Sequence, residues 1–179
     1  MKRFFIRGKP MDYNSYIREV PDFPKPGILF KDLTTLWKDP SAFKSSIDEL
    51  CSHCAGKNIN KVVGPESRGF IVGAPLAYLL GAGFVPARKP MKLPAETVSQ
   101  KYALEYGEAA IEIHRDSISQ GDNVLIVDDL LATGGTTAAM IELVERLGGS
   151  ILECIFLIEL VGLNGRKNLK YPVFSLLKS

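Results

Sequence analysis

Two adjacent carboxylates, followed by a short loop of glycine and hydroxyl residues, are the side chains most able to do chemistry in this sequence. Asp128 and Asp129 come directly after the apolar run Val124–Val127, and the loop 132–136 leads from them into a helical pattern. We expect the apolar run to be a buried parallel strand, because such strands are apolar throughout. In α/β sheets, ligands bind at the carboxyl ends of strands.

The loop has the composition of a site for a single phosphate group. It consists of Ala132, Thr133, Gly134, Gly135 and Thr136. A helix N-terminus offers unpaired N–H groups and the positive end of the helix dipole, and glycines let the backbone approach a ligand closely. The loop lacks the lysine and the spacing of a P-loop, and it lacks the GxGxxG spacing of a dinucleotide site.

Carboxylates this close to a phosphate site would repel the phosphate, so the pair needs an explanation. A ribose 5-phosphate provides one, because Asp128 and Asp129 can accept hydrogen bonds from its hydroxyls while the loop holds its phosphate. The simpler alternative is that the acids only solvate a strand end and the glycines form an ordinary turn. The ordered succession of strand, acid pair, loop and helix favours the ribose 5-phosphate site.

The elements around this segment predict one α/β domain. The chain has 179 residues, enough for a single sizeable core. From residue 59 onward, apolar runs alternate with helical patterns, which indicates a parallel sheet flanked by helices. The expected strands are 61–64, 83–88, 109–114, 123–127, 151–159 and 173–177, and the expected helices are 41–54, 69–80 and 136–147.

Two further segments are expected to be irregular. Prolines and a glycine interrupt any regular element in 20–32, which should form an ordered loop or flap. The region 89–107 is long for a connection in so small a domain, and loops of that length are often functional lids. Its lysines suit closure over an anionic ligand.

The composition limits the classes of partner and compartment. A net charge of +2 argues against nucleic acid or an acidic membrane surface as a partner, and the basic N-terminus is too short in apolar residues for a signal peptide. The three cysteines, an odd number, suit a reducing compartment, so we expect a cytoplasmic protein. The segment CSHC (51–54) is an alternative metal or redox site, but it ends a helical pattern, whereas a redox pair should open a helix.

The segment VLIVDDLLATGGTT (124–137) resembles the phosphoribosyl diphosphate signature of the type I phosphoribosyltransferase family, in particular its adenine-specific members. The resemblance covers nearly the whole chain and implies the fold of that family: a mostly parallel central sheet flanked by helices. It also implies a single domain (1–179), with a small N-terminal hood over the base site at about 1–35 and a mobile active-site loop at about 89–107. The other segments that carry it are FPKPGILFKD (23–32), GPESRGF (64–70), the RK and KLP of 88–94, YALEYG (102–107), LEC (152–154) and FSLL (174–177).

The resemblance assigns roles to further residues. It places the ribose at Asp128 and Asp129 and the 5′-phosphate at 132–136, in agreement with the reasoning from the residues themselves. A cis peptide that is frequent in the family would fall between Glu66 and Ser67. The diphosphate-binding residues implied are Glu66, Ser67, Arg68, Arg88, Lys89 and Lys92.

The base and proton-transfer residues also follow from the resemblance. Leu29, Phe30 and Lys31 match adenine-binding positions, with Leu160 nearby; many members have arginine in place of Lys31, which would give a bidentate contact. Glu105, on the closing loop beside Tyr106, matches the family's proton-handling residue.

The implied activity is Mg²⁺-dependent transfer of the 5-phosphoribosyl group from phosphoribosyl diphosphate to adenine, giving AMP and diphosphate. The resemblance implies a homodimer, and no direct protein ligand to the metal is expected. One alternative is a phosphoribosyltransferase for another purine or for orotate, which the segment 23–32 disfavours. A second is a non-catalytic regulator that senses phosphoribosyl diphosphate, which would need an added nucleic-acid-binding region.

Overall fold

The structure is a computed structural model that describes residues 11–104 and 107–179. The chain divides into two compact units, Met1–Ser46 and Ile47–Ser179, each with its own internal contacts. Helix α2 (Pro40–His53) crosses the boundary between them.

The first unit contains a two-stranded antiparallel hairpin. Strand β1 (Arg18–Pro21) pairs with β2 (Leu29–Asp32), and residues 22–28 connect them. The expectation of an irregular segment over 20–32 is therefore wrong at both of its ends. Pro24 and Pro26 lie in the connection between the strands. Pro21 is the last residue of β1, where a missing backbone N–H is tolerated because β1 is an edge strand.

Contacts across the hairpin hold its two strands in register. Lys31 forms an ion pair with Glu19, the residue opposite it, and Arg18 forms one with Asp32. In the connection, the ring of Phe23 meets that of Phe30 edge to face, with centroids 5.1 Å apart. The hairpin follows the 3₁₀ turn η1 (Tyr13–Tyr16) and precedes α1 (Thr34–Trp37).

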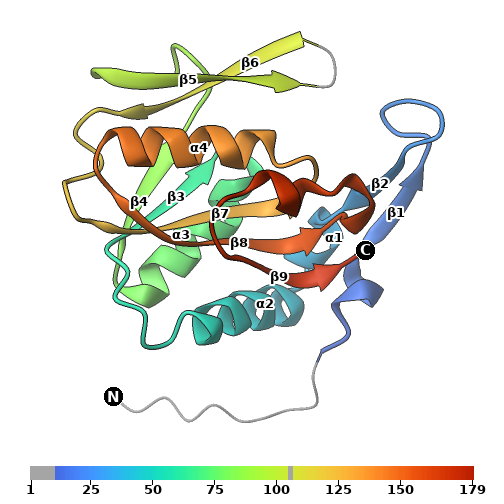
Figure 1. Cartoon of the computed structure of the whole chain (residues 1–179). Helices are drawn as coiled ribbons and strands as arrows, with labels where there is room; N and C mark the ends of the chain where they lie inside the picture. The colour runs from blue at the N-terminus through green and yellow to red at the C-terminus, as the bar shows by residue number, and fades with distance from the viewer. Residues whose placement is uncertain (1–10, 105–106) are drawn as a thin grey trace. The chain divides into compact units, whose positions relative to one another are not determined.

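The second unit is organised around a five-stranded parallel sheet. Its strand order is β4-β3-β7-β8-β9, with β7 in the middle (Figure 1). This confirms the α/β prediction, with strand bounds that differ by a few residues. The strands are β3 (Lys61–Pro65), β4 (Gly83–Ala87), β7 (Asn123–Leu131), β8 (Ser150–Glu159) and β9 (Val173–Lys178).

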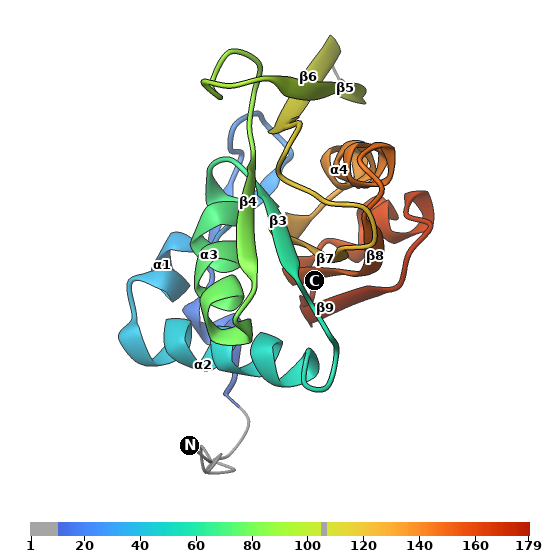
Figure 2. The same ribbon diagram turned by 90° about the vertical axis from the view of Figure 1, so that its left-hand side faces the viewer.

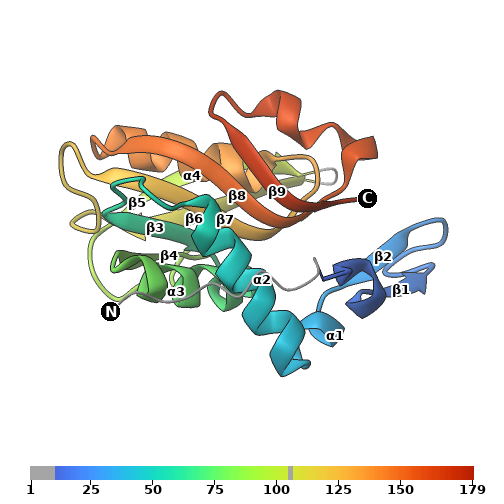
Figure 3. The same ribbon diagram turned by 90° about the horizontal axis from the view of Figure 1, so that it is seen from below.

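Helices cover both faces of this sheet. α3 (Arg68–Leu80) and α4 (Gly135–Arg146) lie on opposite faces, as Figures 2 and 3 show. The sheet is therefore covered on both sides, and residues 124–127 of the central strand are 0% exposed, as the apolar run predicts. The short helices η2 (Val161–Leu163) and η3 (Gly165–Asn168) connect β8 to β9.

One irregularity interrupts the pairing between β7 and β8. Val124 lies opposite Ile151, but the next residue, Leu125, lies opposite Glu153. Leu152 is therefore an extra residue, a β-bulge that shifts the rest of β8 by one position.

The region 89–107 is not an irregular lid throughout, contrary to expectation. Its second half forms β5 (Thr97–Leu104), which pairs antiparallel with β6 (Gly107–His114) in a separate two-stranded sheet. Val98, Ile111 and Ile113 bury their side chains in the main core, which supplies the burial that a strand pair needs. Arg146 of α4 also donates to the carbonyl of Ser99 at 2.9 Å.

Removal of core volume at the centre of the sheet should destabilise the protein. Leu125 is 0% exposed, so we expect Leu125→Ala to lower the free energy of unfolding by about 3–5 kcal/mol. Leu163→Ala is the matched control, because Leu163 is 49% exposed and should cost well under ~1 kcal/mol. Urea denaturation of the two variants measures both values, and equal losses would contradict the assigned core.

Candidate active site

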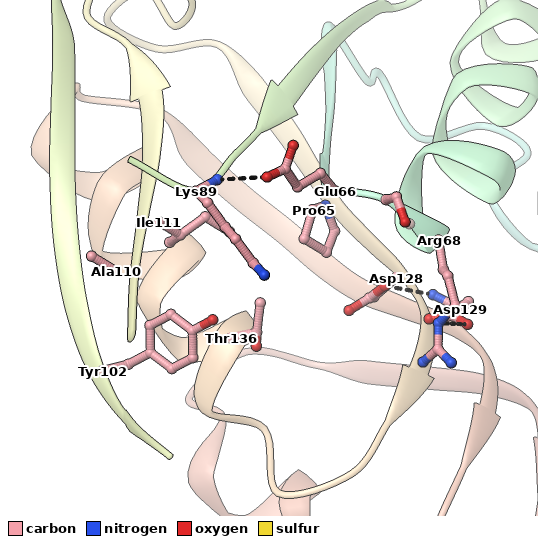
Figure 4. Close-up of a pocket in the computed structure, with 12 residues that line it drawn as sticks. Pro65, Glu66, Arg68, Lys89, Tyr102, Ala110, Ile111, Asp128, Asp129 and Thr136 are labelled. Carbon is pink, nitrogen blue, oxygen red and sulfur yellow. Dashed lines mark hydrogen bonds and ion pairs between the residues drawn. The ribbon is translucent and has the colours of Figure 1, made fainter. Parts of the chain in front are cut away.

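A cavity of ≈310 Å³ opens at the carboxyl ends of β3 and β7. From β3 the chain continues to β4, toward one edge of the sheet, and from β7 it continues to β8, toward the other edge. The direction of winding therefore reverses between β3 and β7. Such a switch point leaves a crevice at the strand ends, where α/β proteins bind ligands. The lining residues are Pro65, Glu66, Ser67, Arg68, Gly69, Lys89, Tyr102, Ala110, Ile111, Asp128, Asp129 and Thr136 (Figure 4).

Asp128 and Asp129 both line this cavity. The sequence predicts that the strand ends before them, but β7 continues to Leu131, so both acids belong to the central strand. This correction follows from the backbone pairing, in which Asp128 lies opposite Phe156 of β8. Neighbouring strand residues point to opposite faces, which gives the two carboxylates different surroundings.

The surroundings of the two carboxylates determine their charge. Asp129 is almost fully buried and forms an ion pair with Arg68, with Oδ2 and Nε 2.9 Å apart. Among the described residues, no donor reaches this Oδ2 with hydrogen-bond geometry. Asp128 accepts the backbone N–H of Asp129 at 2.8 Å. Burial raises the pKa of both carboxyls; the charge of Asp129 adds to the effect on Asp128, and Arg68 offsets part of it for Asp129.

The loop 132–136 connects β7 to the N-terminus of α4. Gly134 caps the helix with a φ of +83°, which favours glycine, and α4 begins at Gly135. Thr136, in the first turn, lines the cavity. The backbone N–H groups of this first turn have no partner within the helix, so they are available to a phosphate.

A second loop, between β3 and α3, contributes Glu66, Ser67 and Arg68. The peptide bond between Glu66 and Ser67 is cis, as the resemblance implies. The Glu66 carboxylate accepts the Nε–H of Arg88 at 2.6 Å and the backbone N–H of Lys89 at 3.1 Å. Burial alone would raise the pKa of Glu66, but these hydrogen bonds outweigh it and lower that pKa.

Glu66 therefore holds the residues after β4 against the loop after β3. Lys89 lines the cavity, and its side chain points toward Thr136 and Tyr102 (Figure 4). Arg88 is not among the lining residues; besides Glu66, its guanidinium binds the carbonyl of Lys92 at 2.8 Å. The structure thus brings Lys89 to the cavity and leaves the side chain of Lys92 exposed and outside its lining.

The hairpin β5–β6 adds lining residues that the sequence did not indicate. Tyr102, Ala110 and Ile111 belong to it. Tyr102 belongs to the run YALEYG, in which the family resemblance assigns a role to Glu105 and none to Tyr102. Ala110 and Ile111 come close to Tyr102 only because β5 and β6 pair antiparallel. Glu105 and Tyr106 lie outside the described residues.

The predicted base-contacting residues belong to the first unit. Leu29 is 48% exposed, Phe30 contacts Phe23, and Lys31 is paired with Glu19.

The segment 51–54 has the features of an ordinary helix end. His53 contacts the Glu153 carboxylate at 2.9 Å and stacks on the ring of Phe174. Burial raises the pKa of the Cys54 thiol to about 11 and that of Cys154 to about 12, so both thiols stay protonated at neutral pH. In residues 11–104 and 107–179, no three His, Cys, Asp or Glu side chains gather into a group that could hold a metal ion.

Within the described part of the chain, no helix has both the length and the apolar character needed to cross a membrane.

Comparisons with known proteins agree on one family. The model of the phosphoribosyl transferase domain matches residues 39–178. An adenine phosphoribosyltransferase of Koribacter versatilis is 58% identical over 91% of this chain and 90% of its own. One of Desulfitobacterium hafniense is 53% identical, over 95% of this chain and 99% of its own.

Solved structures lead to the same result. Adenine phosphoribosyltransferase from Thermoanaerobacter pseudethanolicus superposes with a TM-score of 0.90 at 55% identity, covering 93% of this chain and 97% of its own. The enzyme from Saccharomyces cerevisiae, in complex with an imino-altritol bisphosphate and adenine, gives 0.87 at 45% identity, covering 92% and 96%. The chain belongs to the phosphoribosyltransferase family, among the adenine phosphoribosyltransferases.

Proposed function

We propose that this chain transfers the 5-phosphoribosyl group of phosphoribosyl diphosphate to adenine, giving AMP and diphosphate, a reaction of purine salvage. The observation that carries the proposal is the cavity at the end of β7, where the buried Asp129 and the half-buried Asp128 lie beside a helix N-terminus. A ligand with both a diol and a phosphate satisfies both features. The relatives at 53% and 58% identity, which are named adenine phosphoribosyltransferases, support the base and the reaction.

For the ribose, we assign Asp128 and Asp129. Oδ2 of Asp129 is buried and paired with Arg68, but among the described residues it accepts no hydrogen bond of good geometry. A ribose hydroxyl would add such a donor. In the reaction, the bond from C1 to the diphosphate oxygen breaks, a bond from C1 to adenine N9 forms, and N9 loses its proton. The Asp128 carboxylate would stabilise the positive charge that develops on the ribose.

For the 5′-phosphate, we assign the loop 132–136, and for the diphosphate the residues around the second loop. Ser67, Arg68 and Lys89 line the same cavity and would offset charge on the leaving group. Glu66 acts indirectly, because its carboxylate is occupied by Arg88 and Lys89. We also assign Arg88 and Lys92 to the diphosphate site, at its periphery. Arg88 holds residues 88–92 in place through its hydrogen bond to the Lys92 carbonyl.

We further propose that the reaction uses Mg²⁺. Mg²⁺ is usually bound through one or two carboxylates, water and substrate phosphates, and Asp128 is the carboxylate that lines the cavity beside the proposed diphosphate site. Bound there, Mg²⁺ would neutralise charge on the departing diphosphate.

For the base, we assign Leu29, Phe30 and Lys31 of the hairpin β1–β2. Leu29 is half exposed and offers an apolar surface to a planar ring, and the amine of Lys31 forms an ion pair with Glu19. The yeast relative, solved with adenine, supports adenine as the base. We assign the transfer of the adenine proton to Glu105, on the strength of its place in the YALEYG motif.

We also propose a cytoplasmic homodimer. Ile71 and Tyr78 are 37% and 84% exposed and lie two turns apart on α3, so they form an apolar strip that a second copy could cover. Cys51, Cys54 and Cys154 are thiols rather than disulfides, which suits a reducing compartment.

The direct test is formation of AMP from adenine and phosphoribosyl diphosphate with Mg²⁺, followed by chromatography. We expect turnover with adenine and at least about 100-fold lower kcat/KM with hypoxanthine or guanine, because a base lacking the matching donors and acceptors leaves polar groups unpaired. Activity with guanine or orotate but not with adenine would reassign the base and leave the sugar site intact. No transfer to any base would refute an enzymatic role.

The variant Asp128→Asn should separate activity from stability. We expect kcat/KM for phosphoribosyl diphosphate to fall by about 10- to 100-fold, since a charge-assisted hydrogen bond is lost. The Tm should rise by a few degrees at pH 7, because the raised pKa of Asp128 means that its charged form destabilises the folded state above that pKa. The gain should shrink as pH falls toward 4, where the unfolded state also protonates this carboxyl.

Calorimetry between pH 4 and 7, together with steady-state kinetics, measures both effects of Asp128→Asn. Unchanged kinetics would exclude Asp128 from the ribose site, whereas a Tm that falls at pH 7 would contradict its unfavourable burial.

The variant Glu105→Ala should lower kcat by about 100-fold or more, the usual contribution of a general acid or base. The KM for phosphoribosyl diphosphate should change little, because the assigned role concerns only the adenine proton. Glu96→Ala is the control, since Glu96 is an exposed acid of the preceding segment that pairs with Arg115. Equal losses in kcat and in phosphoribosyl diphosphate binding would refute the assignment of Glu105.

A further inference from the structure

The turn between β8 and β9 lies directly against the loop 132–136. Figure 1 draws this turn in dark red, between β8 and β9. Gly165 is buried although its neighbours Asn164 and Lys167 are exposed. A Cβ atom on Gly165 would lie 2.1 Å from the carbonyl oxygen of Ala132, and one on Gly134 would lie 2.8 Å from the carbonyl oxygen of Gly165. The two backbones therefore pack with no room for a side chain between them.

A side chain of the same turn holds one peptide group of the loop. Nδ2–H of Asn168 donates to the carbonyl oxygen of Thr133 at 2.9 Å. The carbonyl and the N–H of one trans peptide group point in opposite directions, so fixing this oxygen also fixes the direction of the Gly134 N–H. Asn168 is not among the residues that line the cavity, so it acts on a ligand only through the loop.

The turn is itself anchored to the sheet. Arg166 donates from Nε and Nη2 to the two carboxylate oxygens of Glu159, at 3.0 and 2.5 Å, and from Nη1 to the carbonyl of Val173 at 2.5 Å. Glu159 is 4% exposed and also accepts a hydrogen bond from Ser175 of β9 at 2.9 Å. A bidentate pair on a buried carboxylate fixes both distance and orientation, so the turn is held at the ends of β8 and β9.

We propose that the turn 164–168 positions the 5′-phosphate loop, with Asn168 as the positioning residue and the Glu159–Arg166 pair as its anchor. The inference rests on the proposed role of the loop 132–136 as the site of the 5′-phosphate. Two adjacent glycines leave that loop with many accessible conformations. Contact with the turn restricts it before the ligand arrives, which lowers the entropy lost on binding.

The variant Asn168→Ala tests the proposal with four ligands, of which only phosphoribosyl diphosphate and ribose 5-phosphate carry the 5′-phosphate. We expect the KM for phosphoribosyl diphosphate and the Kd for ribose 5-phosphate to rise together, roughly three- to tenfold, the range for loss of one hydrogen bond. The Kd for inorganic diphosphate, the KM for adenine and the Tm should stay within about twofold and one degree of wild type. Isothermal titration calorimetry and steady-state kinetics provide these values.

Two further variants keep the outcome decisive. Asn58→Ala is the matched control, because Asn58 is exposed and precedes the amino end of β3, whereas the cavity opens at the carboxyl ends of the strands. Thr136→Ala removes a hydroxyl of the loop itself and tests the proposed phosphate site directly. Weaker ribose 5-phosphate binding in Thr136→Ala but not in Asn168→Ala would overturn the role of the turn and leave the phosphate site standing.

The remaining outcomes are also informative. No binding of ribose 5-phosphate to the wild type would refute the assignment of the loop, and the proposal for the turn with it. A loss in Asn168→Ala that is equal for all four ligands would identify a general structural defect and overturn the positioning role.

Discussion

Two neighbouring carboxylates at the end of the central strand, Asp129 buried and Asp128 half-buried, constrain everything around the cavity. Removal from water raises the pKa of both carboxyls, and the charge of Asp129 raises that of Asp128 further. Arg68, the first residue of α3, forms an ion pair with Asp129 and so compensates for part of the cost of burying its charge. Asp128 accepts a hydrogen bond from the backbone N–H of Asp129, and the charge of Arg68 lowers its pKa only in part. The protein therefore keeps a costly charge where a ligand can use it, as functional sites commonly do.

The parts of the site that could be predicted from sequence are those that are contiguous. Asp128, Asp129 and the loop 132–136 follow one buried strand, so their order alone predicts that they share the carboxyl end of the sheet. The parallel sheet was predictable for a related reason: strands covered on both faces are apolar throughout, and this pattern survives without knowledge of the partners. The order of the strands and the exact end of β7 could not be predicted, because they depend on which strands pair and on how far β7 pairs with β8.

Features that depend on pairing between distant segments could not be predicted from the sequence. The strand β5 is partly polar and reads as a loop until β6 is paired with it; its inward side chains are then buried on the core. The same holds for Glu66, whose carboxylate looks like a poor choice beside a diphosphate. Only the approach of β4 to β3 supplies the Arg88 and Lys89 donors that occupy it. Neither donor is close to Glu66 in the sequence.

The extra residue in β8 separates that strand into two stretches with different tolerance to change in length. Ahead of Leu152, gain or loss of a residue would only move the point where β8 begins. Beyond it, every side chain of β8 would exchange faces, because side chains alternate along a strand. Glu159, at the far end, would then turn away from Arg166. Insertions and deletions in natural variants of this strand should therefore cluster before residue 152.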